Sequence, residues 1–204
     1  MPNNNTNAAA CTEQDLYEDV NFCPGDRSTP GTRNHFYFVK KSKCQTIPKP
    51  KGYDATKMEE VAVISDNIVL QANETWKKVA LVPLETEVTN QSQGTYGGKT
   101  FQNHVVLVLP GSAKKNTGLI AMLNNDDVLI SVPMANGQHR LFGNANYQTQ
   151  VALSQAQGKT TTDANTTTID VTVDDEFPAP YYEGTLATED GTISGATDAL
   201  VTNP

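Results

Sequence analysis

The chain is poor in the residues that helical, membrane-spanning and nucleic-acid-binding proteins need. Leucine contributes only 13 of 204 residues, and aromatic residues make up 7%. No apolar run approaches the roughly 18 residues of a membrane span. Acidic residues outnumber basic ones by 23 to 15, so the net charge is -8 and there is no general basic surface to grip phosphates. These shortages exclude a helix bundle and a coiled coil, and they argue against a nucleic-acid-binding domain.

Cysteine is also scarce, and its three copies lie in the first quarter of the chain, at Cys11, Cys23 and Cys44. Their spacing matches no zinc-binding pattern. Free thiols in a reducing cytoplasm are the favoured interpretation, and a disulfide between Cys11 and Cys23 is the alternative. The first ten residues carry neither a basic segment nor an apolar run, so we expect no secretion signal.

Neutral polar and β-branched residues fill the composition instead. The chain has 25 Thr, 18 Asn, 17 Val and 7 Ile, and β-branched side chains suit a pleated surface. We therefore predict a mostly β fold, a β-sandwich or barrel with one flanking α-helix. We expect an extended polar arm at 1–34, the β domain at 35–187 and a C-terminal tail at 188–204.

Alternating apolar residues and turn residues indicate where the elements lie. Asn136-Gly137 predicts a hairpin between strands at 127–133 and 138–142, because Asn-Gly accepts the positive φ of a tight turn. A helix is expected near 113–124, capped by Ser112, with its apolar stripe at Leu119, Ile120 and Leu123. Further strands are expected at 35–39, 61–64, 67–72, 76–84, 100–109, 147–153, 169–173, 181–187 and 192–194.

Motifs for catalysis, cofactors or metals are missing. The stretch from Gly94 to Thr100 resembles a phosphate-binding loop, but its first glycine is one residue too close and a strand follows it. His35, His104 and His139 are far apart in sequence, and neighbouring carboxylates on a strand point to opposite faces. We therefore predict no catalytic, cofactor-binding or metal-binding residues.

Charge is distributed unevenly along the chain. From Arg33 to Lys57 there are seven bases and one acid, whereas from Thr160 to Pro204 there are nine acids and no base. The basic segment is either a solvated loop or a contact loop that meets an acidic patch on a neighbouring copy. In the second case, the candidates for contacts between subunits are Lys40, Lys41, Lys43, Lys49 and Lys51.

From about Leu70 onward, the sequence resembles the tail-tube-like virion proteins of tailed phages that infect Bacteroidetes bacteria. The arm from Cys11 to Lys40 is similar as well. The segments that carry the resemblance are Asn90-Gln-Ser-Gln-Gly94, Lys99-Thr-Phe101, Pro110-Gly111, Asn124-Asn125, Arg140-Leu-Phe-Gly-Asn144, Phe177-Pro-Ala-Pro-Tyr-Tyr182 and Gly184-Thr185.

The resemblance implies a structural protein rather than an enzyme. Six copies would form a ring, and rings would stack into the tail tube of a virion that is assembled in the host cytoplasm. Its partners would be other copies and other tail or connector proteins, with phage DNA passing through unbound. No cofactor, small-molecule substrate or membrane is implied. The basic insertion at 33–57 departs from a simple tube subunit and suits a tail-terminator or connector ring.

One predicted strand suits the wall of such a tube. Asp170, Thr172 and Asp174 face one way, and Ile169, Val171 and Val173 face the other. We expect the polar set to line the lumen, because negative charge keeps DNA off a wall within a Debye length of about 8 Å. The alternative function from another class is a carbohydrate-binding or adhesin-like β-sandwich, which would use Tyr181 or Tyr182.

Overall fold

The computed structural model describes residues 15–21, 25 and 29–201, and these form a mostly β structure with several sheets and one α-helix. Cys11 and Cys23 lie outside the described residues. The elements are β1 (His35–Lys40), β2 (Cys44–Thr46), β3 (Val63–Ile64), β4 (Val69–Leu70), β5 (Lys77–Ala80), β6 (Glu87–Gln93), β7 (Thr100–Pro110), α1 (Lys114–Leu123), β8 (Val128–Pro133), β9 (His139–Phe142), β10 (Gln150–Ala156), β11 (Thr166–Asp175), β12 (Tyr181–Tyr182), β13 (Thr185–Thr188) and β14 (Gly191–Ser194).

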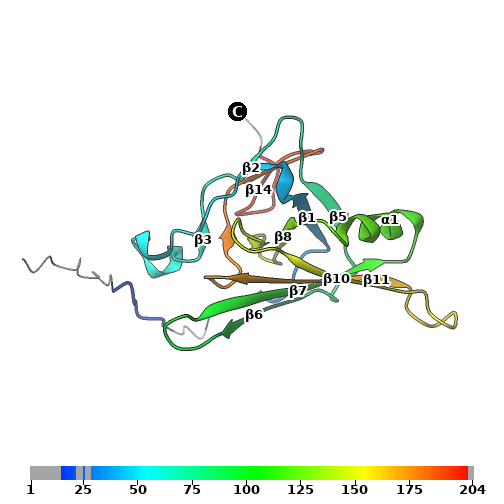
Figure 1. Ribbon diagram of the computed structural model, residues 1–204, viewed down its shortest axis with the longest axis horizontal. Helices are drawn as coiled ribbons and strands as arrows, with labels where there is room; N and C mark the ends of the chain where they lie inside the picture. The colour runs from blue at the N-terminus through cyan, green and yellow to red at the C-terminus, as the bar shows by residue number, and fades with distance from the viewer. Residues whose placement is uncertain (1–14, 22–24, 26–28, 202–204) are drawn as a thin grey trace, which may run out of the picture.

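Two larger sheets form the body of the molecule (Figure 1). One has six strands in the order β3-β12-β9-β8-β1-β5, and the other has four in the order β10-β11-β7-β6. Within the four-stranded sheet every neighbouring pair is antiparallel. The edge strands are therefore β10 and β6 in one sheet, and β3 and β5 in the other.

The main hydrophobic core lies between these two sheets. β7 and β11 contribute every second residue to it, including Val105, Leu107, Ile169 and Val171, all fully buried. The six-stranded sheet contributes Phe36 and alternate residues of β8 and β9 to the same core. Alternation at period two explains this arrangement, because each strand of the four-stranded sheet turns its apolar side inward.

The opposite face of the six-stranded sheet is also covered. Tyr37, Trp76, Leu129 and Tyr182 belong to a second buried cluster, which the hairpin of β13 and β14 covers. All six residues of β8 are buried as a result, because the strand has protein on both faces. The small β2–β4 sheet packs at the margin of the same cluster through Cys44 and Leu70.

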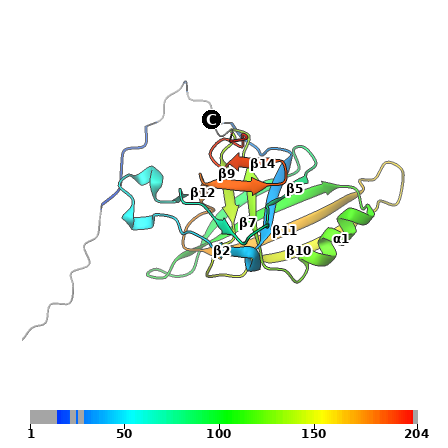
Figure 2. The same ribbon diagram turned by 90° about the horizontal axis from the view of Figure 1, so that it is seen from above.

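The helix α1 flanks one end of the four-stranded sheet (Figures 1 and 2). Its stripe of Leu119, Ile120 and Leu123 packs on the main core, which confirms that prediction. The predicted cap is wrong: Ala113 occupies the N-cap position, and no side chain caps the helix. No helix among the described residues is long and apolar enough to cross a membrane.

Several segments differ from the sequence-based expectations, and β2 (Cys44–Thr46) was not expected as a strand. Residues 150–156, rather than 147–153, form β10, because Asn144 holds the backbone N–H groups of Asn146 and Tyr147 in a loop. The strand β6 was not expected at all. The segment assigned to a C-terminal tail instead packs on the domain: β14 pairs with β13, and Val201 N donates to Thr192 O at 2.8 Å.

Candidate functional site

The outer face of the four-stranded sheet is a mainly polar surface shared by neighbouring strands. The burial pattern of β11 alternates throughout, so Asp170, Thr172 and Asp174 share this face, as predicted. The outward residues of β6, β7 and β10 join them, since the strands are in register. Among these outward residues, Glu87, Asp170 and Asp174 are acidic, His104 is the one histidine, and none is lysine or arginine.

Hydrogen bonds fix the carboxylates of this face. His104 Nε2 lies 2.8 Å from Asp170 Oδ1, and His104 Nδ1 lies 3.4 Å from the Thr89 hydroxyl. Gln93 Nε2 donates to Asp174 Oδ1 at 2.8 Å. These contacts cross three strands, so they hold the polar groups in place without covering them. The side chain of Asp170 stays 45% exposed, which leaves its charge facing solvent.

Both edges of this sheet are open among the described residues. β6 and β10 each pair with one neighbour and present a free row of backbone groups on the other side. The side chains of β10 alternate between exposed and partly buried, and five of the seven in β6 are exposed. An exposed strand edge is a template for pairing with another chain. The edges therefore offer two complementary surfaces for association between copies.

The lysines proposed for contacts between subunits mostly form ion pairs within the chain. Lys40 pairs with Asp126 at 2.6 Å, Lys41 with Asp127 at 2.8 Å, Lys43 with Glu74 at 2.7 Å, and Lys51 with Glu60 at 2.9 Å. These acids lie close to the lysines in the fold but outside the acidic C-terminal quarter, so sequence position alone did not identify them. Exposed pairs of this kind each contribute at most about 1 kcal/mol.

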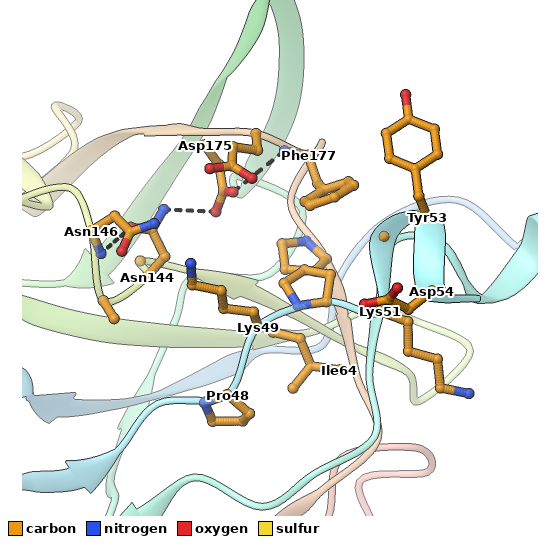
Figure 3. Close-up of a pocket in the computed structure, with 16 residues that line it drawn as sticks. Pro48, Lys49, Lys51, Tyr53, Asp54, Ile64, Asn144, Asn146, Asp175 and Phe177 are labelled. Atoms are coloured by element: carbon orange, nitrogen blue, oxygen red, sulfur yellow. Dashed lines mark hydrogen bonds between the residues drawn. The ribbon is translucent and has the colours of Figure 1, made fainter. Parts of the chain in front are cut away.

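Lys49 makes no ion pair among the described residues and lies at a pocket (Figure 3). The pocket has a volume of about 290 Å³ and lies under the loop of residues 48–54. Asp175 is buried at its far side, where the Asn144 amide donates to Oδ2 at 2.7 Å. Burial raises the pKa of the Asp175 carboxyl, although the Asn144 hydrogen bond opposes this effect. The pocket thus brings a lysine and a buried carboxyl group to the same hollow.

A second cluster gathers around the carboxylate of Asp198, which is only 3% exposed. Arg33 Nη1 donates to its Oδ2 at 2.6 Å, and the Tyr37 hydroxyl donates to Oδ1 at 3.1 Å. The Nε2 atoms of His35 and His139 each lie 3.2 Å from one of its oxygens. His35 and His139 are far apart in sequence, and β1 and β9 bring them to the same carboxylate.

The groups around Asp198 stabilise the negative charge of its carboxylate. Burial by itself would raise the pKa of this carboxyl, but hydrogen bonds from His139, His35 and Arg33 outweigh it and hold the pKa far below its usual range. One signal in the sequence could have found part of the cluster. Arg33, His35 and Tyr37 are spaced by two, so an extended chain places them on one face.

The Asp198 cluster contains serine, histidine and aspartate but is not accessible to a substrate. Ser131 Oγ lies 2.8 Å from His139 Nδ1, and Asp198 contacts the other ring nitrogen. Both Ser131 and His139 are completely buried. The hydroxyl is therefore closed to any substrate in this conformation, and the cluster serves to hold β1, β9 and the C-terminal segment together.

The tyrosines proposed for glycan binding are not free for stacking. Tyr182 is fully buried, and its hydroxyl donates to Thr185 O at 2.9 Å. Tyr181 is partly buried, and the Arg140 guanidinium lies 3.8 Å from its ring centre. Within the described residues, no group of three or more His, Cys, Asp or Glu is arranged to hold a metal ion. Burial raises the pKa of the Cys44 thiol to about 11, so that thiol is unreactive at neutral pH.

Comparison with protein-family models, curated proteins and solved structures finds no match to this chain.

Proposed function

We propose that the protein is a structural subunit of a virion tail, and that copies assemble side by side into rings that stack into a conduit for DNA. The single observation that carries this proposal is the outer face of the four-stranded sheet. It is broad, polar and acidic, and it lies between two open strand edges. An open antiparallel sheet commonly has one solvated face, and a channel wall would also use the acidic charge of this face and its two free edges.

The directions of the strands suit closure into a ring. Since all neighbouring pairs are antiparallel, β10 and β6 at the two edges run in opposite directions. Placing β6 of one copy beside β10 of the next therefore continues the antiparallel pattern without a break. Repetition around a ring, with six copies as the resemblance implies, joins the sheets into one barrel with no free edges.

The charge of this wall suits the passage of DNA. Three acids and no lysine or arginine face outward from its strands, so a duplex meets repulsion instead of binding sites. Threonine, glutamine and serine fill most of the remaining positions, together with Val106, Val108, Ala152 and Ala156. A mostly β fold with one flanking helix agrees with the sandwich or barrel subunit that the resemblance implies. A connector or tail-terminator ring would use the same geometry.

Imaging and mass measurement test this proposal together. The purified protein at high concentration should form particles much heavier than 22.1 kDa, which light scattering detects. Negative-stain images should show rings or tubes with a central hole. On assembly, hydrogen exchange should slow at backbone amides on the free edges of β6 and β10, and the buried amides of β8 serve as the internal reference. A monomer at every concentration would overturn the proposal.

A further inference from the structure

A groove follows the open edge of β5, on the side of the molecule away from the polar face. Its volume is about 900 Å³, and it is lined by the edge strand and by helix α1. Phe38, Val79 and Leu119 give it an apolar floor that continues into the main core. Lys77, Lys78 and Lys115 lie around it together with Glu189 and Asp190, and Lys77 pairs with Glu189 at 2.6 Å, so the groove combines an apolar floor with a rim that keeps a small basic excess.

The edge of β5 has unpaired backbone groups that face this groove. Leu81 N donates to Asn34 O at 2.9 Å, so odd-numbered residues of this segment turn their N–H toward β1. The N–H groups of Lys78 and Ala80 therefore point to the open side, between Trp76 N, which donates to Ala187 O at 2.8 Å, and Val82 N, which donates to Val108 O at 2.8 Å. Trp76 also lines the groove, and its indole N–H is buried without a partner in the described part of the chain.

A segment of the same chain has the complementary chemistry. Residues Asp15–Asn21 form no helix or strand, and two apolar side chains there are strongly exposed: Tyr17 at 93% and Val20 at 84%. In an extended conformation, Leu16, Glu18 and Val20 lie on one face, and Asp15, Tyr17 and Asp19 lie on the other. Such a strand can place Leu16 and Val20 on the groove floor, with Glu18 between them, and direct its acids to Lys78 and Lys115.

The path of the chain favours a second copy as the source of this segment. Thr32 pairs with Met134, and Ala135 N donates to Gly31 O at 3.0 Å. The chain therefore approaches β1 from the side of β8, opposite to β5. In the structure the segment rests on its own loop instead, where Met58 N donates to the Glu18 carboxylate at 3.3 Å.

We propose that residues Asp15–Asn21 of one copy add as an extended strand to the open edge of β5 in a second copy. The backbone of the added strand pairs with Lys78 and Ala80, as in other cases of strand addition. Its acids meet the basic rim of the groove. The proposal rests on the proposed homo-oligomer in one respect, namely that the partner is a second copy of the chain. It links the copies through a surface other than the β6 and β10 edges.

The first test replaces Ala80 in the full chain. Ala80→Pro removes an N–H that faces the groove and leaves the hydrogen bonds to β1 in place. A fluorescent peptide with the sequence of residues 12–21 should bind the wild-type chain and bind Ala80→Pro about tenfold more weakly. Ala80→Ser, which keeps the N–H, should bind like the wild type. Thermal unfolding checks that the proline variant is folded, and equal binding by all three proteins would overturn the proposal.

The second test exchanges charge and does not depend on the proline. Lys115→Glu should weaken binding of the wild-type peptide, and a peptide with Asp19→Lys should bind the wild-type protein weakly. The two changes together should restore binding, because the reversed pair attracts again. If the two losses simply add, the arm does not meet the basic rim and the proposal fails.

These outcomes separate this inference from the proposed function. Peptide binding without rings or tubes would leave the arm contact standing and refute the tail-subunit proposal. Rings that form equally well in wild type and Ala80→Pro, with no binding of the peptide, would refute the arm contact alone.

Discussion

At the scale of single residues, Asp198 is the group on which the most contacts converge. Its carboxylate joins Arg33 and His35 from the start of β1 to His139 on β9, and it is almost completely buried. A left-handed backbone, with φ of 55°, places the side chain in this position. The residue closes the C-terminal segment onto the domain, which explains why residues 195–201 are part of the fold.

Replacing Asp198 with asparagine should therefore destabilise the protein strongly. The amide keeps the shape but loses the charge that balances Arg33, and its own NH₂ group faces other donors. We expect a loss of about 2–4 kcal/mol in the free energy of unfolding. Urea denaturation measures this loss, and Asp190→Asn on the exposed surface nearby is the matched control, with a change below about 0.5 kcal/mol. Equal stability of the two variants would contradict the role of Asp198.

The same residue predicts a dependence on pH. The pKa of Asp198 is lowered in the folded protein, so its contribution is complete above the unfolded value of about 3.9 and falls as pH decreases below it. The difference in unfolding free energy between wild type and Asp198→Asn should thus shrink between about pH 4 and pH 2. Urea titrations at several pH values test this, and a difference that grew on acidification would have the wrong sign.

At the scale of elements, alternating apolar residues located β11 well, although the alternation at 147–153 placed the start of β10 three residues too early. Ile169, Val171 and Val173 mark β11, and the turn at Asn136-Gly137 lies between β8 and β9. β6 was missed because only Val88 in it packs on the core, and pairing with β7 stabilises the rest. The polar face was predictable on β11, where polar and apolar residues alternate. The Asp198 cluster was not, because it depends on contacts between residues more than 160 positions apart.

Two glycines show how differently elements tolerate the same change. A Cβ at Gly195 would clash with Tyr182 O and would lie 2.8 Å from Gly184 O, whereas a Cβ at Gly118 in α1 meets nothing within 4 Å. Gly195→Ala should cost about 1–3 kcal/mol by overpacking. Gly118→Ala should stabilise by about 0.5–1 kcal/mol, since alanine favours the helix. Urea denaturation of both variants measures the two changes in unfolding free energy. We expect these changes to have opposite signs, and equal signs would contradict the prediction.

At the scale of the whole molecule, we propose different tasks for different surfaces. In this proposal the outer face of the four-stranded sheet repels nucleic acid, its two edges join neighbours, and the groove at β5 receives an arm. The second core fixes the C-terminal segment from the other side. Most of the basic insertion is neutralised within the chain, so its lysines support the fold more than they attract a partner.

Reversing the charge of the polar face should change DNA binding and leave assembly intact. Asp170→Lys combined with Asp174→Lys places cations on the proposed wall, and assembled particles should then retain a labelled duplex at low salt. Wild-type particles should retain none. Asp54→Lys with Glu59→Lys makes the same charge change on an exposed loop and is the matched control. Equal retention by both double variants would place the face outside the channel.

The most direct measurement is the structure of the assembled particle by electron cryomicroscopy, at a resolution that separates strands. The account predicts a closed ring in which β6 of each copy lies antiparallel to β10 of the next, with Asp170 and Asp174 facing the central hole. Particles whose hole is lined by other elements, or in which these strands remain unpaired, would contradict it.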